Sequence, residues 1–561
     1  MTTYNKKREP QIKETITHEG GTGYTQSDEA TLIGILSTGL DNTYYENMGE
    51  REIRFAEVLN KVAKKNKIFA AKSLIYARTV FGQRTVTHRG AVELIPYLQG
   101  DELGKRFFSK RNRKANEGGI IYRLDDMTEI LACYLAKNGE NASIPNSIKK
   151  GFKDAIENAD AYQLAKYQMK GKNVSLVDIV NLVHPNQTKF QGTIKIALNN
   201  YFKAVKGTKW EHKIVAKGHT DEFIEIPTLH ALILGILTQF NTVEDKNTKT
   251  GQTVAAKVIS GEITQDEAKV ELNIAKTENY KELIETKKIG YLALLRNVRN
   301  ILKTDDFDLL NKACNLLTQE TFIKKSLVFP HQIDLALEIM LIEFSGAQLK
   351  KVAKALSEAY ELSIPNISTL FPTGKTAVVY DTSGSMGGGW HNGIAIAKGI
   401  KINSKPVEKA ALIAATLAKG IDGDVYQFGT SCRKIIGWNP LDSVNSLKQL
   451  FISQIGKVGH GTAYSTIFPE LDRSGGHYDR VFIITDEQAA DSVERSHKAY
   501  CNKYGTPHVY FINLCGYSPT VMKANTKVHR ITGYHADIYE LAKKSEVNPN
   551  IIIKEINAIV I

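Results

Sequence analysis

The chain has 561 residues, which is too many for a single hydrophobic core, so two or more domains are expected. Its formal net charge of +13 favours a polyanionic partner, with nucleic acid as the leading candidate. The five cysteines are scattered, with no CxxC pair and no zinc-finger spacing, which argues against a disulfide scaffold and favours a reducing compartment.

The first 24 residues are rich in Gly, Thr, Lys and Glu, and we expect a flexible N-terminal arm there. They lack the apolar core of a signal peptide. The longest apolar stretch of the chain, around Leu229–Phe240, is too short to cross a bilayer. We therefore expect a cytoplasmic protein without a membrane partner.

From about Thr25 to Leu370, apolar residues recur at helical spacing in segments that Gly, Pro or Asn separate. No convincing strand alternation interrupts them. Residues 25–372 are therefore expected to form an all-α domain, either an α-solenoid of stacked helix pairs or an irregular helical bundle. The expected helices include Glu29–Leu40, Arg51–Lys65, Ile68–Val80, Ala91–Leu98, Asp126–Ala136 and Pro145–Ala159.

After Pro372 the pattern changes to alternating strands and helices. Such alternation predicts a parallel sheet covered by helices, and so a Rossmann-like α/β domain over residues 373–561. Strands are expected at Ala377–Tyr380, Asp424–Phe428, Val481–Ile484 and Val509–Leu514, with a helix at Pro406–Lys419.

Oxygen-bearing side chains follow two of these strands. The motif DTSGS at residues 381–385 places one carboxylate and two hydroxyls on a tight turn, a second strand leads to Asp486, and a glycine-rich loop presents Thr462. Taken alone, DTSGS could also be an ordinary Ser/Gly turn. Because the carboxyl ends of neighbouring parallel strands converge on one crevice, we expect a divalent cation site there, with Mg²⁺ as the first choice. The expected ligands are Asp381, Ser383, Ser385, Thr462 and Asp486.

This set resembles the metal-ion-dependent adhesion site of von Willebrand factor A domains, in which all five positions have counterparts. Segments of the helical region resemble the TROVE module of the Ro ribonucleoprotein family. Residues 164–170 (LAKYQMK) and 178–185 (DIVNLVHP) resemble its basic helix and its histidine-bearing helix, and residues 291–297 (YLALLRN) resemble its ALLRN helix. Pro330-His331 with residues 336–338 (ALE), and residues 372–375 (PTGK), resemble later segments. The glycine-rich segment after Met386 departs from the pattern.

The resemblance implies a HEAT-like helical-repeat ring closed by the A domain, as a monomer, in a bacterial or phage Ro-like protein. It implies that small noncoding Y-like RNA binds the outer basic face and that single-stranded 3′ ends of misfolded RNA enter the central hole. RNA quality control or stress-linked RNA processing would be the role. Partnership with an exoribonuclease stays open.

An RNA-binding site needs cations that contact phosphates and planar groups that contact bases. Lys166 and Lys170 lie four residues apart and so share a helix face, although a solvated lysine stripe would look the same. The run at residues 105–114 carries six cations and two aromatic residues, but it could also be a solvated loop. The family likeness favours RNA contact for His184, which could otherwise be a core histidine. The expected RNA-binding residues are Lys166, Lys170, His184, Arg78, Arg84, His88, Lys110, Arg111, Arg113, Arg123 and Arg296.

No Ser-His-Asp order, paired-carboxylate spacing, Walker loop or zinc-protease motif stands out in the chain, so we expect no catalytic residues and no enzyme. The first alternative to RNA binding is a Mg²⁺-dependent protein-interaction module without a specific RNA ligand. A weaker alternative is a metal-assisted RNA hydrolase that uses Glu487 as a base.

Overall fold

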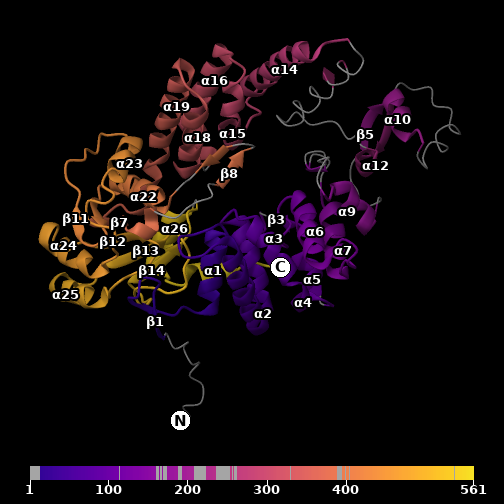
Figure 1. The fold of residues 1–561 in the computed structure, drawn as a ribbon. Coiled ribbons are helices and arrows are strands. Elements are labelled where there is room, and N and C mark those ends of the chain that lie inside the picture. Colours follow the sequence, from indigo (N-terminus) through magenta and orange to yellow (C-terminus); the bar gives the residue numbers. More distant parts are fainter. Residues whose placement is uncertain are drawn as a thin grey trace. The chain divides into compact units, whose positions relative to one another are not determined.

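The structure is a computed structural model that describes residues 13–100, 102–112, 114–159, 163–164, 167, 173–186, 193–207, 223–234, 253–254, 257, 262–326, 328, 330–387, 394–397, 400–402, 405–535 and 537–561 (Figure 1). The described chain is mostly helical and contains one six-stranded sheet. It forms two compact units. The first unit comprises residues 1–62, 80–83 and 284–557, and the second comprises residues 63–79, 84–283 and 558–561.

The first unit therefore joins α1 and the last helices of the predicted helical domain to the α/β region. A domain boundary at residue 372 stays a prediction.

Helix α2 (Met48–Thr79) bends sharply at one residue. Asn66 has φ −153° and ψ 87°, which are not helical values. Its side-chain oxygen accepts a hydrogen bond from the Phe69 amide at 3.0 Å, as an N-cap does for a new helix. The two helices predicted at 51–65 and 68–80 are therefore confirmed as the two arms of α2, separated where Asn66 competes for backbone hydrogen bonds.

The second unit is built mainly from short helices. These are α3 (Thr85–Glu93), α4 (Ile95–Leu98), α5 (Glu102–Phe107), α6 (Asp125–Asn138), α7 (Asn146–Glu157), α9 (Leu176–Val183), α10 (Leu198–Val205), α12 (Thr228–Ile233) and most of α14 (Gln265–Glu285). Its strands are β3 (Arg111–Asn112), β4 (Glu117–Gly118), β5 (Thr193–Ala197) and β6 (Phe223–Pro227).

The expectation of an all-α region is wrong for part of the second unit. Strands β5 and β6 pair antiparallel from Thr193 opposite Pro227 to Ala197 opposite Phe223. Their sequences, TIKIA and FIEIP, alternate apolar and polar residues with the period of a strand. The alternation is short and the two halves are far apart in sequence, which is why the helical pattern around them hid it.

In the first unit, helices of the C-terminal part of the predicted helical domain lie against the α/β region. These helices are α15 (Tyr291–Leu302), α16 (Phe307–Leu317), α17 (Glu320–Ser326), α18 (Pro330–Glu343), α19 (Ala347–Ser363) and α20 (Pro365–Leu370). Tyr360 of α19 shares a hydrogen bond of 2.8 Å with Thr416 of the α/β region. The buried ammonium group of Lys448 lies 2.7 Å from Asp334 and 2.8 Å from Glu338, both on α18.

The sheet of the first unit has the strand order β11-β10-β7-β12-β13-β14, in which only β11 is antiparallel. This is the doubly wound order. The strand order reverses between β7 and β12, which run parallel to each other, and this position is the topological switch point. The strands are β7 (Thr376–Asp381), β10 (Asp424–Phe428), β11 (Cys432–Lys434), β12 (Arg480–Thr485), β13 (His508–Asn513) and β14 (Val528–Thr532). All four predicted strands are confirmed, because each consists mainly of apolar residues that are buried on both faces of the sheet.

Helices cover both faces of this sheet (Figure 1). On one face, Val379, Ile483 and Phe511 share a core with Phe468 and Tyr500. On the other, Phe482 stacks on Tyr510, with ring centroids 4.4 Å apart. The covering helices are α22 (Pro406–Ile421), α23 (Val444–Ile452), α24 (Ile467–Ser474), α25 (Glu494–Tyr504) and α26 (Ile538–Val547), and α27 (Ile551–Asn557) follows.

Helix α1 (Asp28–Thr38) packs beside β14. The guanidinium group of Arg51, which is 1% exposed, donates hydrogen bonds to Cys515 O at 2.9 Å and Gly39 O at 2.9 Å. The N-terminal helices of the first unit are thus fixed to the C-terminal end of its sheet.

A flexible arm over residues 1–24 is not what the structure shows for residues 13–24. Strands β1 (Glu14–Ile16) and β2 (Thr22–Tyr24) form an antiparallel hairpin. Tyr24 exchanges backbone hydrogen bonds of 2.8 and 3.0 Å with Thr520, which fixes the hairpin on the α/β region. The polar composition of this segment reflects its position at the surface. The remaining residues of the predicted arm lie outside the described residues.

Among the described helices, none is both long enough and apolar enough to span a membrane.

Candidate metal site and basic groove

The switch point of the sheet places two loops side by side. Asp381 ends β7 and Asp486 follows β12, and Tyr380 pairs with Ile484 across these two strands. Open α/β sheets bind ligands at this kind of position, because the loops diverge there and leave a crevice.

The loop after β7 is ordered by its own polar groups. The Ser383 amide donates to Asp381 Oδ1 at 2.9 Å, and Thr485 donates to Asp381 Oδ2 at 2.6 Å. The hydroxyl oxygens of Ser383 and Ser385 lie 3.2 Å apart. One carboxylate and two hydroxyls therefore lie within one hydrogen-bonded turn.

The loop with Thr462 reaches the same place. The Gly384 amide donates to His460 O at 2.9 Å, and the Ala490 amide donates to Thr462 O at 3.0 Å. Gly459 has φ +80°, and a Cβ atom there would lie 2.4 Å from the Thr430 hydroxyl, so the turn requires glycine. The structure thus brings the loops that carry all five residues predicted as metal ligands to the same end of the sheet.

These five side chains are buried, with exposed fractions between 0% and 2%. Burial raises the pKa of Asp486, and the charge of Asp381 raises it further, although the Gln488 amide and the Ser385 hydroxyl act in the opposite direction. Burial also raises the pKa of Asp381, against the hydrogen bonds from Thr485 and Ser383. Two buried carboxylates whose pKa values are raised would be stabilised in their charged forms by a bound cation.

Two buried oxygens of this site lack a hydrogen-bond partner among the described residues, and they are Thr462 Oγ1 and Asp486 Oδ2. A hard divalent cation would satisfy both, since it takes carboxylate and hydroxyl oxygens as ligands. The residues fit Mg²⁺ in donor type. The described part of the chain holds no group of three or more His, Cys, Asp or Glu side chains placed to bind a metal. Metal binding by this set of two carboxylates and three hydroxyls stays a proposal.

Several residues predicted to bind RNA instead form buried hydrogen bonds within the second unit. Asp126, which is 0% exposed, accepts hydrogen bonds from Arg78 at 2.9 Å, and His88 Nε2 lies 2.9 Å from the same oxygen. Its other oxygen accepts the Tyr122 and Arg123 amides at 3.1 and 2.8 Å. Arg78 and His88 are 4% and 3% exposed, so in this structure neither side chain is open to a ligand.

The neighbouring carboxylate, Asp125, accepts hydrogen bonds from two other residues that were predicted to bind RNA. Arg84 donates to Asp125 at 2.9 Å, and Arg123 donates to both oxygens of Asp125 at 3.0 Å. The Arg123 guanidinium carbon lies 5.0 Å from the centre of the Tyr167 ring. The side chains of Arg84 and Arg123 are 38% and 37% exposed, so a ligand can reach part of each.

The basic run lines a groove of about 750 Å³ in the second unit. Arg111 is buried in its wall and donates to Gly118 O at 2.8 Å and Val560 O at 3.2 Å, so it is a structural residue. Lys110 donates to Gln163 at 2.6 Å. The groove is lined by Arg106, Ser109, Lys110, Arg111, Asn112, Lys114, Glu117, Gly118, Tyr122, Asp154, Asn158, Gln163, Val560 and Ile561.

The prediction named Lys110, Arg111 and Arg113 in this run but not Arg106 or Lys114, which are the exposed cations among the described residues of the groove. The two adjacent aromatic residues of the run, Phe107 and Phe108, are fully buried, so the run is packed against its unit and its cations cannot all be equally exposed. Tyr122, the aromatic residue of the groove, lies outside the run and was not predicted.

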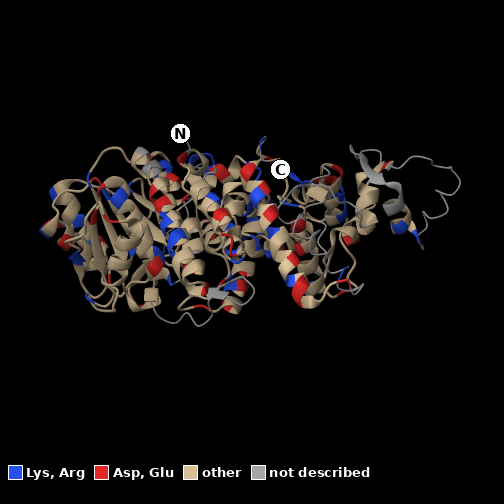
Figure 2. Ribbon diagram, turned by 90° about the horizontal axis from the view of Figure 1, so that it is seen from above, with Lys and Arg blue, Asp and Glu red and all other residues tan. Residues whose placement is uncertain are grey.

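Three predicted RNA-binding residues, Lys166, Lys170 and Arg113, lie outside the described residues. His184 is exposed at the end of α9 and has φ 44°, in the left-handed region. Arg296 is exposed on α15, in the first unit. Figure 2 shows that lysine and arginine are interspersed with aspartate and glutamate along the described helices, so the charge of +13 does not form long runs of one sign there.

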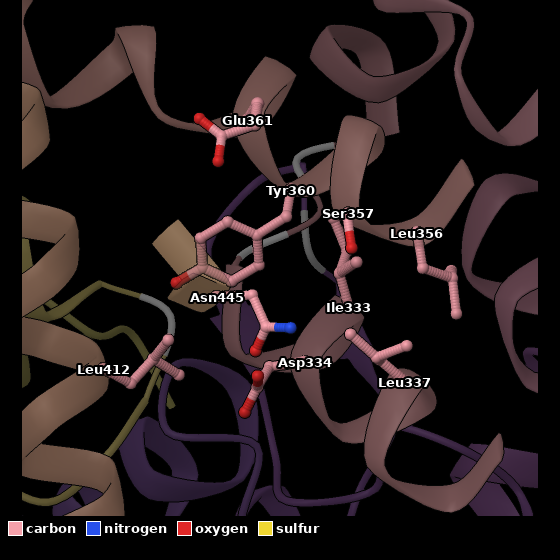
Figure 3. A pocket seen from close by; sticks show the side chains of 9 residues that line it. All are labelled: Ile333, Asp334, Leu337, Leu356, Ser357, Tyr360, Glu361, Leu412 and Asn445. Atoms are coloured by element: carbon pink, nitrogen blue, oxygen red, sulfur yellow. The ribbon is translucent and has the colours of Figure 1, made fainter. Parts of the chain in front are cut away.

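A further enclosed pocket lies in the first unit, between α18, α19, α22 and the start of α23 (Figure 3). Its volume is about 10 Å³, which is room for at most one water molecule. Asp334, Tyr360 and Asn445 line it together with apolar side chains. It is a packing gap between helices and has no room for a cofactor.

The fold and the candidate site define a class: a helical protein that carries a doubly wound α/β domain with an oxygen-rich site at its switch point. Among solved structures, the chain is similar to the crystal structure of the Ro (RSR) protein of Deinococcus radiodurans, with a TM-score of 0.48 and 15% sequence identity, over 93% of this chain and 100% of that chain. No family model and no curated protein matches the chain.

Proposed function

We propose that the protein is a noncatalytic RNA-binding protein of the Ro type. The groove with Arg106, Lys110 and Lys114 carries this proposal. It combines cations for phosphates with the Tyr122 ring and the amide groups of Asn112, Asn158 and Gln163, which suit exposed bases. A duplex-binding surface would need mainly phosphate contacts, so single-stranded RNA is the preferred ligand.

The finer parts of the proposal follow the sequence resemblance. Small noncoding Y-like RNA and single-stranded 3′ ends are the proposed ligands, and RNA quality control is the proposed role. A ring closed by the α/β domain is likewise part of this proposal and follows from the sequence resemblance. Within the first unit, α1 packs on β14 and α19 packs on α23.

The groove is tested by removing its two exposed cations. We expect Arg106→Ala with Lys114→Ala to weaken binding of a hairpin RNA with a single-stranded tail, and to reduce the slope of log affinity against log salt by about 0.7 per lost phosphate contact. Fluorescence anisotropy at several salt concentrations measures both quantities. Lys269→Ala, which removes a 77% exposed lysine of α14, is the matched control. Equal slopes for the double variant and the control would place RNA elsewhere.

The second candidate function is a Mg²⁺-dependent protein-interaction module, and the buried unpaired oxygens of Thr462 and Asp486 favour it. In our proposal this site is a Mg²⁺-dependent docking or ring-closing element beside RNA binding. Asp381→Ala should abolish Mg²⁺ binding in calorimetry and leave RNA affinity within about twofold, since the two sites use separate residues. Loss of both activities in a folded variant would contradict separate sites.

A further inference from the structure

An open cleft of the first unit lies at the opposite end of the strands from Asp381. It is lined by Arg480 and His508, the first residues of β12 and β13, and Arg480 pairs with Thr376 at the start of β7. Its volume is about 400 Å³. Pockets that bind small molecules have volumes of ~300 to 1,000 Å³, so the cleft has room for one. It shares no residue with the basic groove or with the candidate metal ligands.

Lys527 lines this cleft and begins a chain of hydrogen bonds. Its Nζ lies 2.8 Å from His508 Nε2, and His508 Nδ1 lies 2.8 Å from His529 Nε2. An ammonium group can only donate, so His508 Nε2 accepts, and the ring proton of His508 is on Nδ1 and is donated to His529. Burial and the charge of Lys527 lower the pKa of His508, in agreement with a neutral ring. The half-buried ammonium group of Lys527 is thus positioned by a neutral partner.

The charge of Lys527 is available to a ligand. Arg480, the other cation of the cleft, donates to Glu546 at 2.8 Å, and Asp479, the carboxylate among the lining residues, accepts the Lys375 amide at 2.7 Å. No carboxylate of the described residues forms an ion pair with Lys527. A half-buried ammonium group without an anionic partner favours an anion as the ligand.

Two further lining residues carry planar rings. The ring centroids of His477 and Tyr504 are 6.4 Å apart, and the side chain of His477 is 52% exposed. Accessible rings of this kind stack on nucleobases. The cleft therefore combines a cation suited to phosphate with rings suited to a base.

We propose that this cleft binds the terminal phosphate monoester of a nucleotide, with Lys527 donating to the phosphate and with His477 and Tyr504 contacting the base. A phosphate monoester carries about −1.5 to −2 charges at neutral pH and has three strong acceptor oxygens, so it supplies the charge that a neutral imidazole cannot. A free mononucleotide and the 5′-phosphorylated end of an RNA both carry this group.

Calorimetric titration of the full-length chain with AMP and with adenosine tests the proposal. We expect AMP to bind at least ~10-fold more tightly than adenosine, because only AMP offers the charged acceptor. Lys527→Gln should remove this difference. Lys498→Gln, which removes an exposed lysine of α25 outside the cleft, should bind AMP as the parent does. Parent-like AMP binding by Lys527→Gln would overturn the proposal.

A pair of RNAs distinguishes the two sources of the phosphate. One single-stranded RNA is compared with a 5′ phosphate and with a 5′ hydroxyl, so that contacts elsewhere on the protein are the same for both. A gain of affinity from the phosphate that disappears in Lys527→Gln would assign the cleft to RNA ends, whereas a gain with AMP alone would assign it to free nucleotides. A gain with neither ligand, or one that persists in Lys527→Gln, would contradict the proposal.

Nuclear magnetic resonance of the parent protein locates the ligand without a variant. We expect AMP to shift the imidazole resonances of His508 and His477, which line the cleft, and to leave those of His460 unchanged, since His460 is exposed in the loop before Thr462. Unchanged resonances of both cleft histidines at saturating AMP would place the nucleotide elsewhere and overturn the proposal.

Discussion

Asp126 shows how the second unit uses charge at the level of single residues. The carboxylate is fully buried, but both of its oxygens accept hydrogen bonds, and Arg78 supplies the compensating charge. A buried charge of this kind is tolerated because its partners replace the lost water. Arg78 and His88 are therefore part of the core, and their removal would change RNA binding only indirectly.

Removing this carboxylate should be costly. We expect Asp126→Ala to lower the stability of α6 by about 3 to 5 kcal/mol, because it leaves the buried Arg78 without a partner. Hydrogen exchange of the α6 amides measures the opening free energy. Asp266→Ala, which removes a 91% exposed carboxylate, should change stability by less than about 0.5 kcal/mol. Similar values for the two variants would contradict the structural role of Asp126.

The lowered pKa of Asp126 makes the stability of the second unit depend on pH. Burial raises the pKa of its carboxyl, but the hydrogen bond with His88 and the charge of Arg78 outweigh this and lower the pKa to about 2. The ordinary value in an unfolded chain is about 3.9. The group therefore contributes about 2 kcal/mol of stability above pH ~4, and this contribution disappears as the pH falls towards 2.

Acid unfolding of parent and variant tests this sign. Asp126→Asn should be less stable than the parent at neutral pH, and the difference should shrink below pH ~4, as protonation removes the charge in the parent too. A difference that stays constant down to pH 2 would show that the carboxylate charge contributes nothing.

At the level of elements, the break in α2 is set by one side chain. Asn66 caps the second arm of the helix through the Phe69 amide. We expect Asn66→Ala to cost about 1 kcal/mol, measured as faster hydrogen exchange at the Phe69 amide. Asn66→Ser, which also caps helices, should retain most of the protection. If Asn66→Ala instead increased protection throughout residues 63–69, the helix would be straightening, and the cap would not be the cause of the break.

The candidate metal site is likewise a property of elements. Asp381 and Asp486 lie at neighbouring strand ends because β7 and β12 pair with each other. Thr462 follows the turn at Gly459 in a third loop. The rest of the environment comes from a hairpin more than 350 residues earlier in the chain, through contacts of residues 17, 18 and 21.

At the level of the whole molecule, the proposed RNA function predicts a preference of substrate shape. An RNA with a structured body and a free single-stranded 3′ tail should bind at least about tenfold more tightly than a blunt duplex of equal length, since unstacked bases can reach aromatic and amide groups and a duplex cannot. Competition between tailed and blunt forms of one hairpin measures the ratio. Matched affinities would indicate that RNA contacts the protein only through its phosphates.

The sequence by itself determined the α/β strands, and it predicted a set of oxygen-bearing residues at their ends. Both signals are local: an apolar run buried on both faces is readable without its partners, and DTSGS lies within five residues. The break of α2 at Asn66 could be read in the same way, since its cause lies three residues away.

Only the tertiary structure decided which cations are buried and which are exposed. Arg78 and Arg106 look alike in the sequence, but Arg78 faces Asp126, 48 residues away, and Arg106 lines the groove. The same holds for the N-terminal hairpin, where Glu19 accepts a hydrogen bond from Tyr45 and the His18 amide donates to Gln488 in the loop after Asp486. The reason is physical: side-chain chemistry is fixed by residue type, whereas burial, and with it the cost and the use of a charge, depends on neighbours that folding brings from elsewhere in the chain.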